Sequence, residues 1–135
     1  MSRKIARENT YKLIFEFLFN KTPNSRTYSV FSLGEMDDSD VAYMEKVYYG
    51  VINRYEELSE IISEYSQGFS LDRIYKPDLS ALLLAVYELK YMDDIPPAVT
   101  INEAVDLVKK YSTDKSNVFV NGILSAVNKN LSEKK

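Results

Sequence analysis

Basic and aromatic side chains recur at four-residue intervals near the N-terminus. The residues at this spacing are Arg3, Arg7, Tyr11 and Phe15, and Lys4 adds a further cation next to Arg3. Residues four apart lie on one ridge of a helix, so guanidinium groups and rings would stand side by side. Such a surface suits single-stranded RNA, because guanidinium groups contact phosphates and rings stack on unpaired bases. The alternative is an ordinary helix with a basic start, in which Phe15 packs beneath residues 27–33.

A second group of polar and aromatic residues surrounds the expected start of the last helix. Its members are Tyr111, Lys115, Ser116, Asn117, Phe119 and Asn121. Exposed N–H groups at a helix start can bind phosphate. The alternative is that Ser112 or Thr113 merely caps the helix and that Phe119 belongs to the core. Considered from the residues alone, the structural alternative is favoured for both groups.

The composition argues against catalytic chemistry. The chain of 135 residues contains no histidine and no cysteine, which removes imidazole acid–base groups, thiolate nucleophiles and the commonest metal ligands. A serine or threonine nucleophile would lack its usual base, and the four glycines are too scattered for a phosphate loop. We therefore predict that the protein is not an enzyme and has no cofactor and no metal site.

Charge and hydropathy limit the partners. Lysine and arginine number 17 against 20 aspartate and glutamate residues, a net charge of −3. This balance argues against non-specific coating of nucleic acid, which needs many phosphate contacts, but leaves room for a local basic patch. No apolar run of the sequence approaches the length of about 18 residues that is needed to cross a membrane. The basic N-terminal segment lacks the apolar stretch of a signal peptide. We predict a cytoplasmic protein without membrane association.

Helical periodicity dominates the chain and would position both groups. We expect helices over residues 3–19, from the acidic run 37–40 to 52, over 58–65 after a break near 53–54, over 77–89, over 100–110 and from about 115 to 131. Ser70 can cap a short turn through Arg73, and Thr100 with Glu103 can form a capping box for the helix that follows. The helix over 77–89 is apolar on most sides and should be central. Residues 27–33 fit either a short helix or an extended piece. The predicted fold class is all-α, a single domain of two small three-helix bundles packed side by side. The halves, about 1–68 and 69–135, would meet near Gly68.

The C-terminal half carries a more specific signal. Residues 95–109 read Ile-Pro-Pro-Ala-Val-Thr-Ile-Asn-Glu-Ala-Val-Asp-Leu-Val-Lys, and residues 119–124 read Phe-Val-Asn-Gly-Ile-Leu. Asn and Gly are poor residues for a helix interior, so we expect the Asn121 amide to bond a backbone group or a neighbouring helix end. This pattern resembles the NusB family of bacterial transcription antitermination factors. The resemblance covers nearly the whole chain, strongly over 3–15 and 69–127, and implies the same two-bundle fold.

The resemblance implies a function and a set of residues. Proteins of this family bind the boxA element of nascent RNA together with NusE, a small-subunit ribosomal protein, and associate with elongating RNA polymerase, so that ribosomal RNA operons are read through. Carried over by alignment, the RNA-binding residues would be Arg3, Lys4, Arg7, Tyr111, Lys115, Ser116 and Phe119. The NusE-binding residues would include Phe15 and Asp78, which should lie on one exposed surface. Arg3, Lys4 and Arg7 should share a face with Lys115.

Several positions depart from the family pattern. The basic arm is shorter than in Arg-rich members, Leu83 stands where many members have Arg, and Tyr111-Ser112 replaces Phe-Gly. Lys115 replaces a frequent acidic residue, which should favour RNA binding. The family includes monomers and dimers, so a homodimer is compatible with the resemblance. Two rival functions are an RNA-binding accessory domain, as found fused to ribosomal-RNA methyltransferases, and a helical scaffold without an RNA role.

Overall fold

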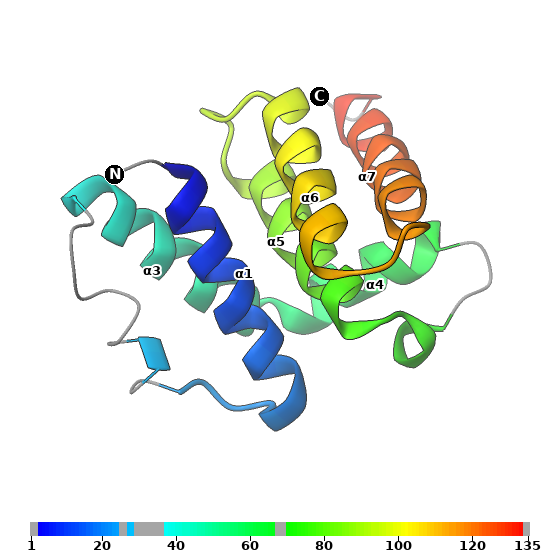
Figure 1. The fold of residues 1–135 in the computed structure, drawn as a ribbon. Coiled ribbons are helices and arrows are strands. Elements are labelled where there is room, and N and C mark those ends of the chain that lie inside the picture. The colour runs from blue at the N-terminus through cyan, green and yellow to red at the C-terminus, as the bar shows by residue number, and fades with distance from the viewer. Residues whose placement is uncertain (1–2, 25–26, 29–36, 67–69, 134–135) are drawn as a thin grey trace.

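The computed structural model describes residues 3–24, 27–28, 37–66 and 70–133. Within these ranges the regular structure is entirely helical, so the all-α prediction is confirmed. The elements are α1 (Arg3–Asn20), α3 (Asp38–Asn53), α4 (Tyr55–Tyr65), the short 3-10 helix η1 (Leu71–Arg73), α5 (Lys76–Tyr91), α6 (Pro97–Tyr111) and α7 (Ser116–Glu133) (Figure 1). Among the described residues, no helix combines the length and apolarity needed to cross a membrane.

Local sequence accounts for most helix ends. The Asp37 carboxylate accepts a hydrogen bond from the Asp40 backbone N–H at 2.9 Å, which caps α3 where the acidic run predicted a start. The expected break before α4 falls at Arg54. A capping box of Thr100 and Glu103 was expected to begin α6, and this is wrong. The helix already begins at Pro97, a residue suited to a first turn, so Thr100 lies inside it.

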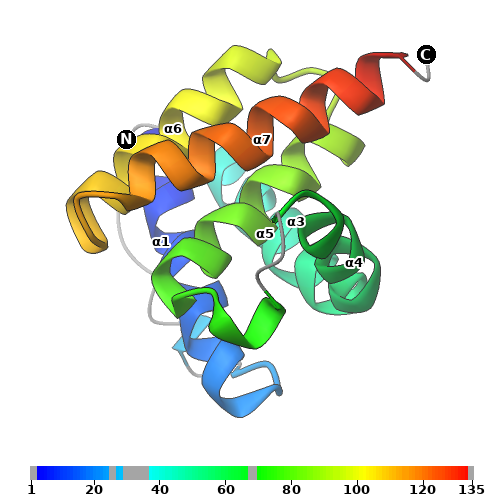
Figure 2. The ribbon, with the colours of Figure 1, turned by 90° about the vertical axis from the view of Figure 1, so that its right-hand side faces the viewer.

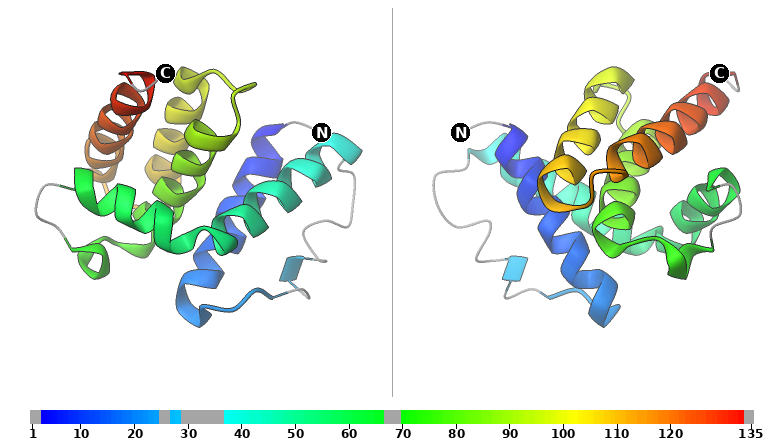
Figure 3. Two further views of the ribbon diagram at one scale, coloured as in Figure 1. Left: turned by 180° about the vertical axis from the view of Figure 1, so that it is seen from behind. Right: turned by 45° about the vertical axis from the view of Figure 1, so that its right-hand side comes forward.

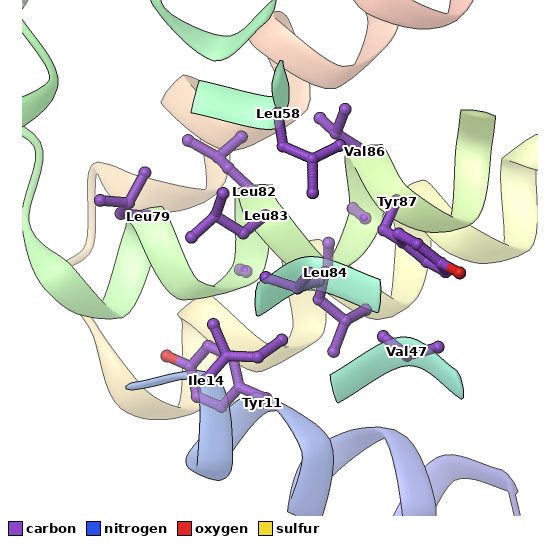
Figure 4. Close-up of a cluster of buried hydrophobic side chains, with 14 of the residues drawn as sticks. Tyr11, Ile14, Val47, Leu58, Leu79, Leu82, Leu83, Leu84, Val86 and Tyr87 are labelled. Atoms are coloured by element: carbon purple, nitrogen blue, oxygen red, sulfur yellow. The ribbon is translucent and has the colours of Figure 1, made fainter. Parts of the chain in front are cut away.

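Helix α5 is the centre of the molecule. Its side chains from Asp78 to Leu89 are all buried, as expected for a helix that is apolar on most sides. It packs against α1, α3, α4, α6 and α7. Figure 4 shows Leu82, Leu83 and Leu84 of this helix among side chains from its neighbours. The apolar core is therefore continuous from one side of the molecule to the other.

The remaining helices lie on two sides of α5. Helices α1 and α3 pack together on one side, and α6 and α7 pack together on the other, with α4 reaching α5 and α7 (Figures 2 and 3). This placement brings the start of α1 beside α6, although about a hundred residues separate them in sequence. Gly68, the predicted boundary, and most of residues 27–33 lie outside the described residues. A division into two halves at Gly68 stays a prediction.

Candidate functional site

Charged side chains join α1 to α6 along one line, which we call the α1–α6 seam (Lys4, Glu8, Glu103, Asp106 and Lys110). The Lys4 ammonium lies 3.3 Å from a Glu103 carboxylate oxygen and 3.8 Å from one of Asp106. One turn further along α1, the Lys110 ammonium donates to both Glu8 carboxylate oxygens at 2.8 and 3.1 Å. The seam therefore fixes the N-terminal basic arm against the helix that leads into the last loop.

Arg7 lies behind this seam in a buried network. Its Nε donates to Glu88 Oε2 at 2.8 Å, and its two Nη atoms reach Glu88 Oε1 and Glu103 Oε1, each at 3.3 Å. The hydroxyl of Tyr43 also donates to Glu88 Oε2, and that of Thr100 donates to Glu88 Oε1 at 2.7 Å. Burial alone would lower the pKa of Arg7, but the hydrogen bond to Glu88 and the nearby Tyr43, Glu88 and Glu103 raise it. The network ties α1, α3, α5 and α6 together.

The burial of Arg7 corrects one expectation. Its guanidinium was expected on an RNA-facing surface, but the residue is 4% exposed and its donors point at interior carboxylates. Sequence spacing placed Arg7 on the ridge of Arg3 and Tyr11 without showing that Glu88 would lie opposite. Any contribution of Arg7 to RNA binding would thus act through the positions of its neighbours.

Arg3 and Lys4 point to different neighbours. Arg3 Nε donates to Asp40 Oδ1 at 2.9 Å, and its guanidinium lies 4.7 Å from the centre of the Tyr43 ring on α3. Lys4 turns toward α6 and remains largely exposed. Arg3, Lys4 and Arg7 thus point toward α3, toward α6 and into the interior. Arg7 therefore does not share an exposed face with Lys115 as expected, and a common face for Arg3, Lys4 and Lys115 stays a prediction.

Tyr111, at the end of α6, is held from several sides. Its hydroxyl donates to Glu8 Oε1 at 2.7 Å, and its ring lies 5.6 Å from the Tyr11 ring, centre to centre. The ammonium groups of Lys12 and Lys110 lie 5.6 and 5.2 Å from the centre of the Tyr111 ring. The hydrogen bonds from Lys110 and then Tyr111 lower the pKa of Glu8. An exposed ring with cations near it can stack on a base while the cations attract the phosphates of the RNA.

Asp78 lies under the loop that follows Tyr111. Its carboxylate accepts hydrogen bonds from Ser112 Oγ at 2.6 Å and Ser116 Oγ at 3.0 Å, and the residue is 4% exposed. Thr113 N–H also donates to Ser116 Oγ, at 3.2 Å. The expectation that Asp78 lies on an exposed surface is wrong, because it is used to hold the start of α7. The Ser116 side chain is likewise turned inward.

Lys115 and Phe119 line a pocket of about 590 Å³ between η1 and the start of α7. Lys115 is exposed and Phe119 is half-buried. The opposite wall is formed by Arg73 and by Tyr75, whose side chain is 63% exposed. Sequence reasoning missed both of these residues. The turn expected after Ser70 could have indicated them, because it forms η1 and places Arg73 and Tyr75 at the pocket beside the start of α7.

Phe15 is half-buried, and its ring meets the Phe19 ring edge-on at 5.0 Å. Phe19 is 60% exposed, and the Lys76 ammonium lies 5.2 Å from its ring centre. Phe19 is a further residue that sequence reasoning missed, although continuing the four-residue spacing by one step would have found it. The aromatic ridge of α1 therefore extends to the end of the helix.

The Asn121-Gly122 pair lies on the outer face of α7. Asn121 is exposed, and its Oδ1 accepts a bond from Ser125 Oγ of the same helix at 3.4 Å. A Cβ added at Gly122 would have no described atom within 4 Å. The prediction that the Asn121 amide bonds a backbone group or a neighbouring helix end is therefore wrong. The apolar side of α7 packs against the core, so Asn121 and Gly122 face outward.

Comparison with known proteins places this geometry in a family. The model of the NusB family matches residues 4–129. A transcription antitermination protein NusB of Natranaerobius thermophilus is 39% identical over 131 residues, with 94% of each chain covered. The protein of the same description from Alkaliphilus oremlandii is 43% identical over 125 residues, covering 92% of this chain and 91% of the relative.

Solved structures agree with the sequence comparison. NusB of T. maritima superposes with a TM-score of 0.86 at 31% identity, covering 96% of this chain and 92% of that one. A crystal structure of the antitermination factors NusB and NusE in complex with dsRNA gives a TM-score of 0.84 at 28% identity, covering 95% and 96%. The match thus extends over fold, length and sequence, and the chain belongs to the NusB family.

Proposed function

We propose that this protein is a non-enzymatic transcription antitermination factor that acts in the cytoplasm. It binds boxA-containing RNA together with NusE and associates with the elongating RNA polymerase to support ribosomal RNA synthesis. Relatives that match over nearly the full chain are described as transcription antitermination proteins, and one solved relative is in complex with NusE and RNA. The observation that carries the proposal is the Tyr111 ring, which is partly exposed, packs beside Tyr11 and has two cations near it.

The proposed RNA-binding residues divide into contacting and supporting groups. Lys4, Tyr111, Lys115 and Phe119 reach solvent and contact the RNA, with Arg3 adding charge at the edge of the site. Arg7 and Ser116 act from within, because their side chains bond Glu88 and Asp78. Arg7 supports the seam and Ser116 supports the loop that bears Lys115.

The proposed NusE surface is the aromatic ridge at the C-terminal half of α1. Phe15 and Phe19 provide adjoining apolar rings, and Lys76 adds a cation at their edge. Asp78, which the resemblance assigns to the same partner, is buried and bonds Ser112 and Ser116, so it would act on NusE binding indirectly, through the loop that it holds. A large, partly exposed aromatic group of this kind is typical of a protein interface.

The test is titration of boxA RNA and a scrambled RNA of equal length, with and without NusE, at several salt concentrations. Lys115→Ala should weaken boxA binding and lower the slope of log affinity against log salt by about one. Lys129→Ala, a cation near the other end of α7, is the matched control and should leave both quantities unchanged. Equal affinity for boxA and scrambled RNA, or an unchanged Lys115→Ala variant, would contradict the proposal.

A further inference from the structure

An acidic side chain, that of Glu8, lies within the proposed RNA site, in contact with Tyr111. The Glu8 carboxylate contacts Lys110 at 2.8 Å and the Tyr111 hydroxyl at 2.7 Å. Charge alone makes a carboxylate unfavourable beside phosphates. By electrostatics alone, removing Glu8 should therefore strengthen RNA binding, so a favourable role for Glu8 in this site must be of another kind.

The position of Tyr111 indicates what that role is. Tyr111 occupies the last position of α6, where the chain leaves the helix, and its ring is partly exposed. Its hydroxyl is bonded to Glu8 while its ring leans on Tyr11. An aromatic side chain at such a position samples several rotamers unless its far end is fixed. The bond to Glu8 fixes that end, so the cost of ordering the ring is met before any ligand binds.

The fixed ring forms one wall of a pocket of about 260 Å³ beside α1. The other walls are the side chains of Tyr11, Lys12, Pro77 and Phe15, the last of which also borders the proposed NusE surface. The lining is mainly aromatic, and the Lys12 and Lys110 ammonium groups both lie within 6 Å of the Tyr111 ring centre. An apolar side chain of a protein would need the rings alone, whereas an unstacked nucleobase brings a phosphate that uses the cations as well.

We propose that Glu8 is a positioning residue that holds Tyr111 in place as the stacking wall of a pocket for one unstacked RNA base. This inference rests on the proposed function and adds a specific site to it. Glu8 contributes through the orientation of Tyr111, although its own charge opposes the approach of phosphate. The same carboxylate also keeps Lys110 beside the ring.

The experiment measures the affinity of boxA RNA for the full-length protein in the presence of NusE. Glu8→Ala should weaken binding by about threefold to tenfold, since a loosened ring loses part of its stacking. The salt slope should stay unchanged, because the phosphate contacts remain. Glu8→Gln should bind at least as tightly as the wild type, because an amide oxygen can still accept the Tyr111 hydroxyl while the repulsion is gone.

Two further variants separate positioning from charge. Asp106→Ala removes another carboxylate from the seam and should tighten binding slightly, as charge alone predicts. Tyr111→Phe lacks the hydroxyl and should weaken binding. Adding Glu8→Ala to it should cause little further loss, since Glu8 then has no hydroxyl to hold and only the position of Lys110 still depends on it. Melting curves check that each variant is folded.

The outcomes are distinguishable. Glu8→Ala binding as tightly as the wild type, or tighter, overturns the inference and leaves the proposed function intact. Equal losses from Glu8→Ala in the wild-type and Tyr111→Phe backgrounds also overturn it, because Glu8 would then act elsewhere. If Glu8→Ala lowers the affinity for NusE and leaves the affinity for RNA unchanged, the pocket binds the protein partner instead, and the inference is overturned. Failure of the wild-type protein to prefer boxA RNA overturns the proposed function and the inference with it.

Discussion

Arg7 and Glu8 are neighbours on α1, and both reach side chains of α6, yet they lie in opposite environments. Arg7 is 4% exposed and bonds Glu88 and Glu103, whereas the Glu8 side chain is 22% exposed and bonds Lys110 and Tyr111. One step along a helix turns a side chain by about 100°. That rotation directs Arg7 into the junction of four helices and Glu8 onto the seam above it.

The comparison separates two uses of charge. Around Glu88, each carboxylate oxygen accepts two donors, so the network is satisfied internally and specifies how α1, α3, α5 and α6 meet. Around Glu8, water reaches the groups and screens their attraction, so the contacts can rearrange for a ligand at small cost. The buried cluster therefore serves the fold, and the exposed cluster is free to serve binding.

The largest expected effect is on stability, from Arg7→Ala. Removing one member of a buried ion pair leaves the other charge without compensation, which costs about 3–5 kcal/mol. We expect this loss in the free energy of unfolding, measured by urea denaturation. Lys4→Ala, which removes an exposed cation of the same helix, should cost under about 1 kcal/mol. Similar values for the two variants would mean that the Arg7–Glu88 pair does not hold the helices together.

A smaller effect should separate the two tyrosines that bond these carboxylates. Tyr43→Phe removes a donor from the buried Glu88 and should cost about 1–3 kcal/mol, the range for an unsatisfied buried acceptor. Tyr111→Phe removes a donor from the partly exposed Glu8, which water can replace, and should cost under about 0.5 kcal/mol of stability. Thermal melts of both variants test this, and a costlier Tyr111→Phe would contradict it.

The fold was largely predictable because periodicity and helix-end residues are local signals. The acidic run at Asp37 predicted a helix start, and the apolar residues over 77–89 predicted a central helix. Both predictions are confirmed. The misplaced start at Thr100 shows the limit of local reasoning. A Thr and a Glu three residues apart suggested a cap, but their oxygens meet Glu88 and Arg7 from other helices, contacts that no local pattern contains.

The site was harder to predict, because a residue's type does not state whether it faces solvent. Spacing placed Tyr11 on the same exposed ridge as the basic residues, but Tyr11 is 3% exposed and its ring packs beside Tyr111. The resemblance drew attention to Tyr111 and Lys115, which are exposed. The inward turn of Arg7 and Asp78 depended on partners 81 and 34 or more residues away along the chain. Phe19 and Tyr75 are 60% and 63% exposed, and local signals, the four-residue spacing and the turn after Ser70, could have indicated them.

A double-mutant cycle of Glu8→Ala and Lys110→Ala should give a coupling energy of about 0.2–1 kcal/mol, as for other exposed ion pairs. Because the pair is reached by solvent, the coupling should shrink when salt is raised to about 1 M, where the Debye length is about 3 Å. Chemical denaturation with urea at two salt concentrations measures this. A coupling above about 2 kcal/mol, or one insensitive to salt, would place this pair with the buried cluster.

The smallest effect concerns pH and reports on the same exposed pair. The bonds from Lys110 and Tyr111 lower the pKa of Glu8 in the folded protein. A carboxyl group whose folded pKa lies below its unfolded value adds stability above the unfolded value, about 4.3 for glutamate, and loses it as pH falls through the folded value. Glu8→Gln removes this titration, so the wild type should lose slightly more stability than the variant between pH 6 and pH 3. Urea titrations of both proteins across this range give the difference. An equal loss in both would mean that Glu8 is not ionically tied to Lys110 in solution, and the exposed cluster would then reduce to the hydrogen bond with Tyr111.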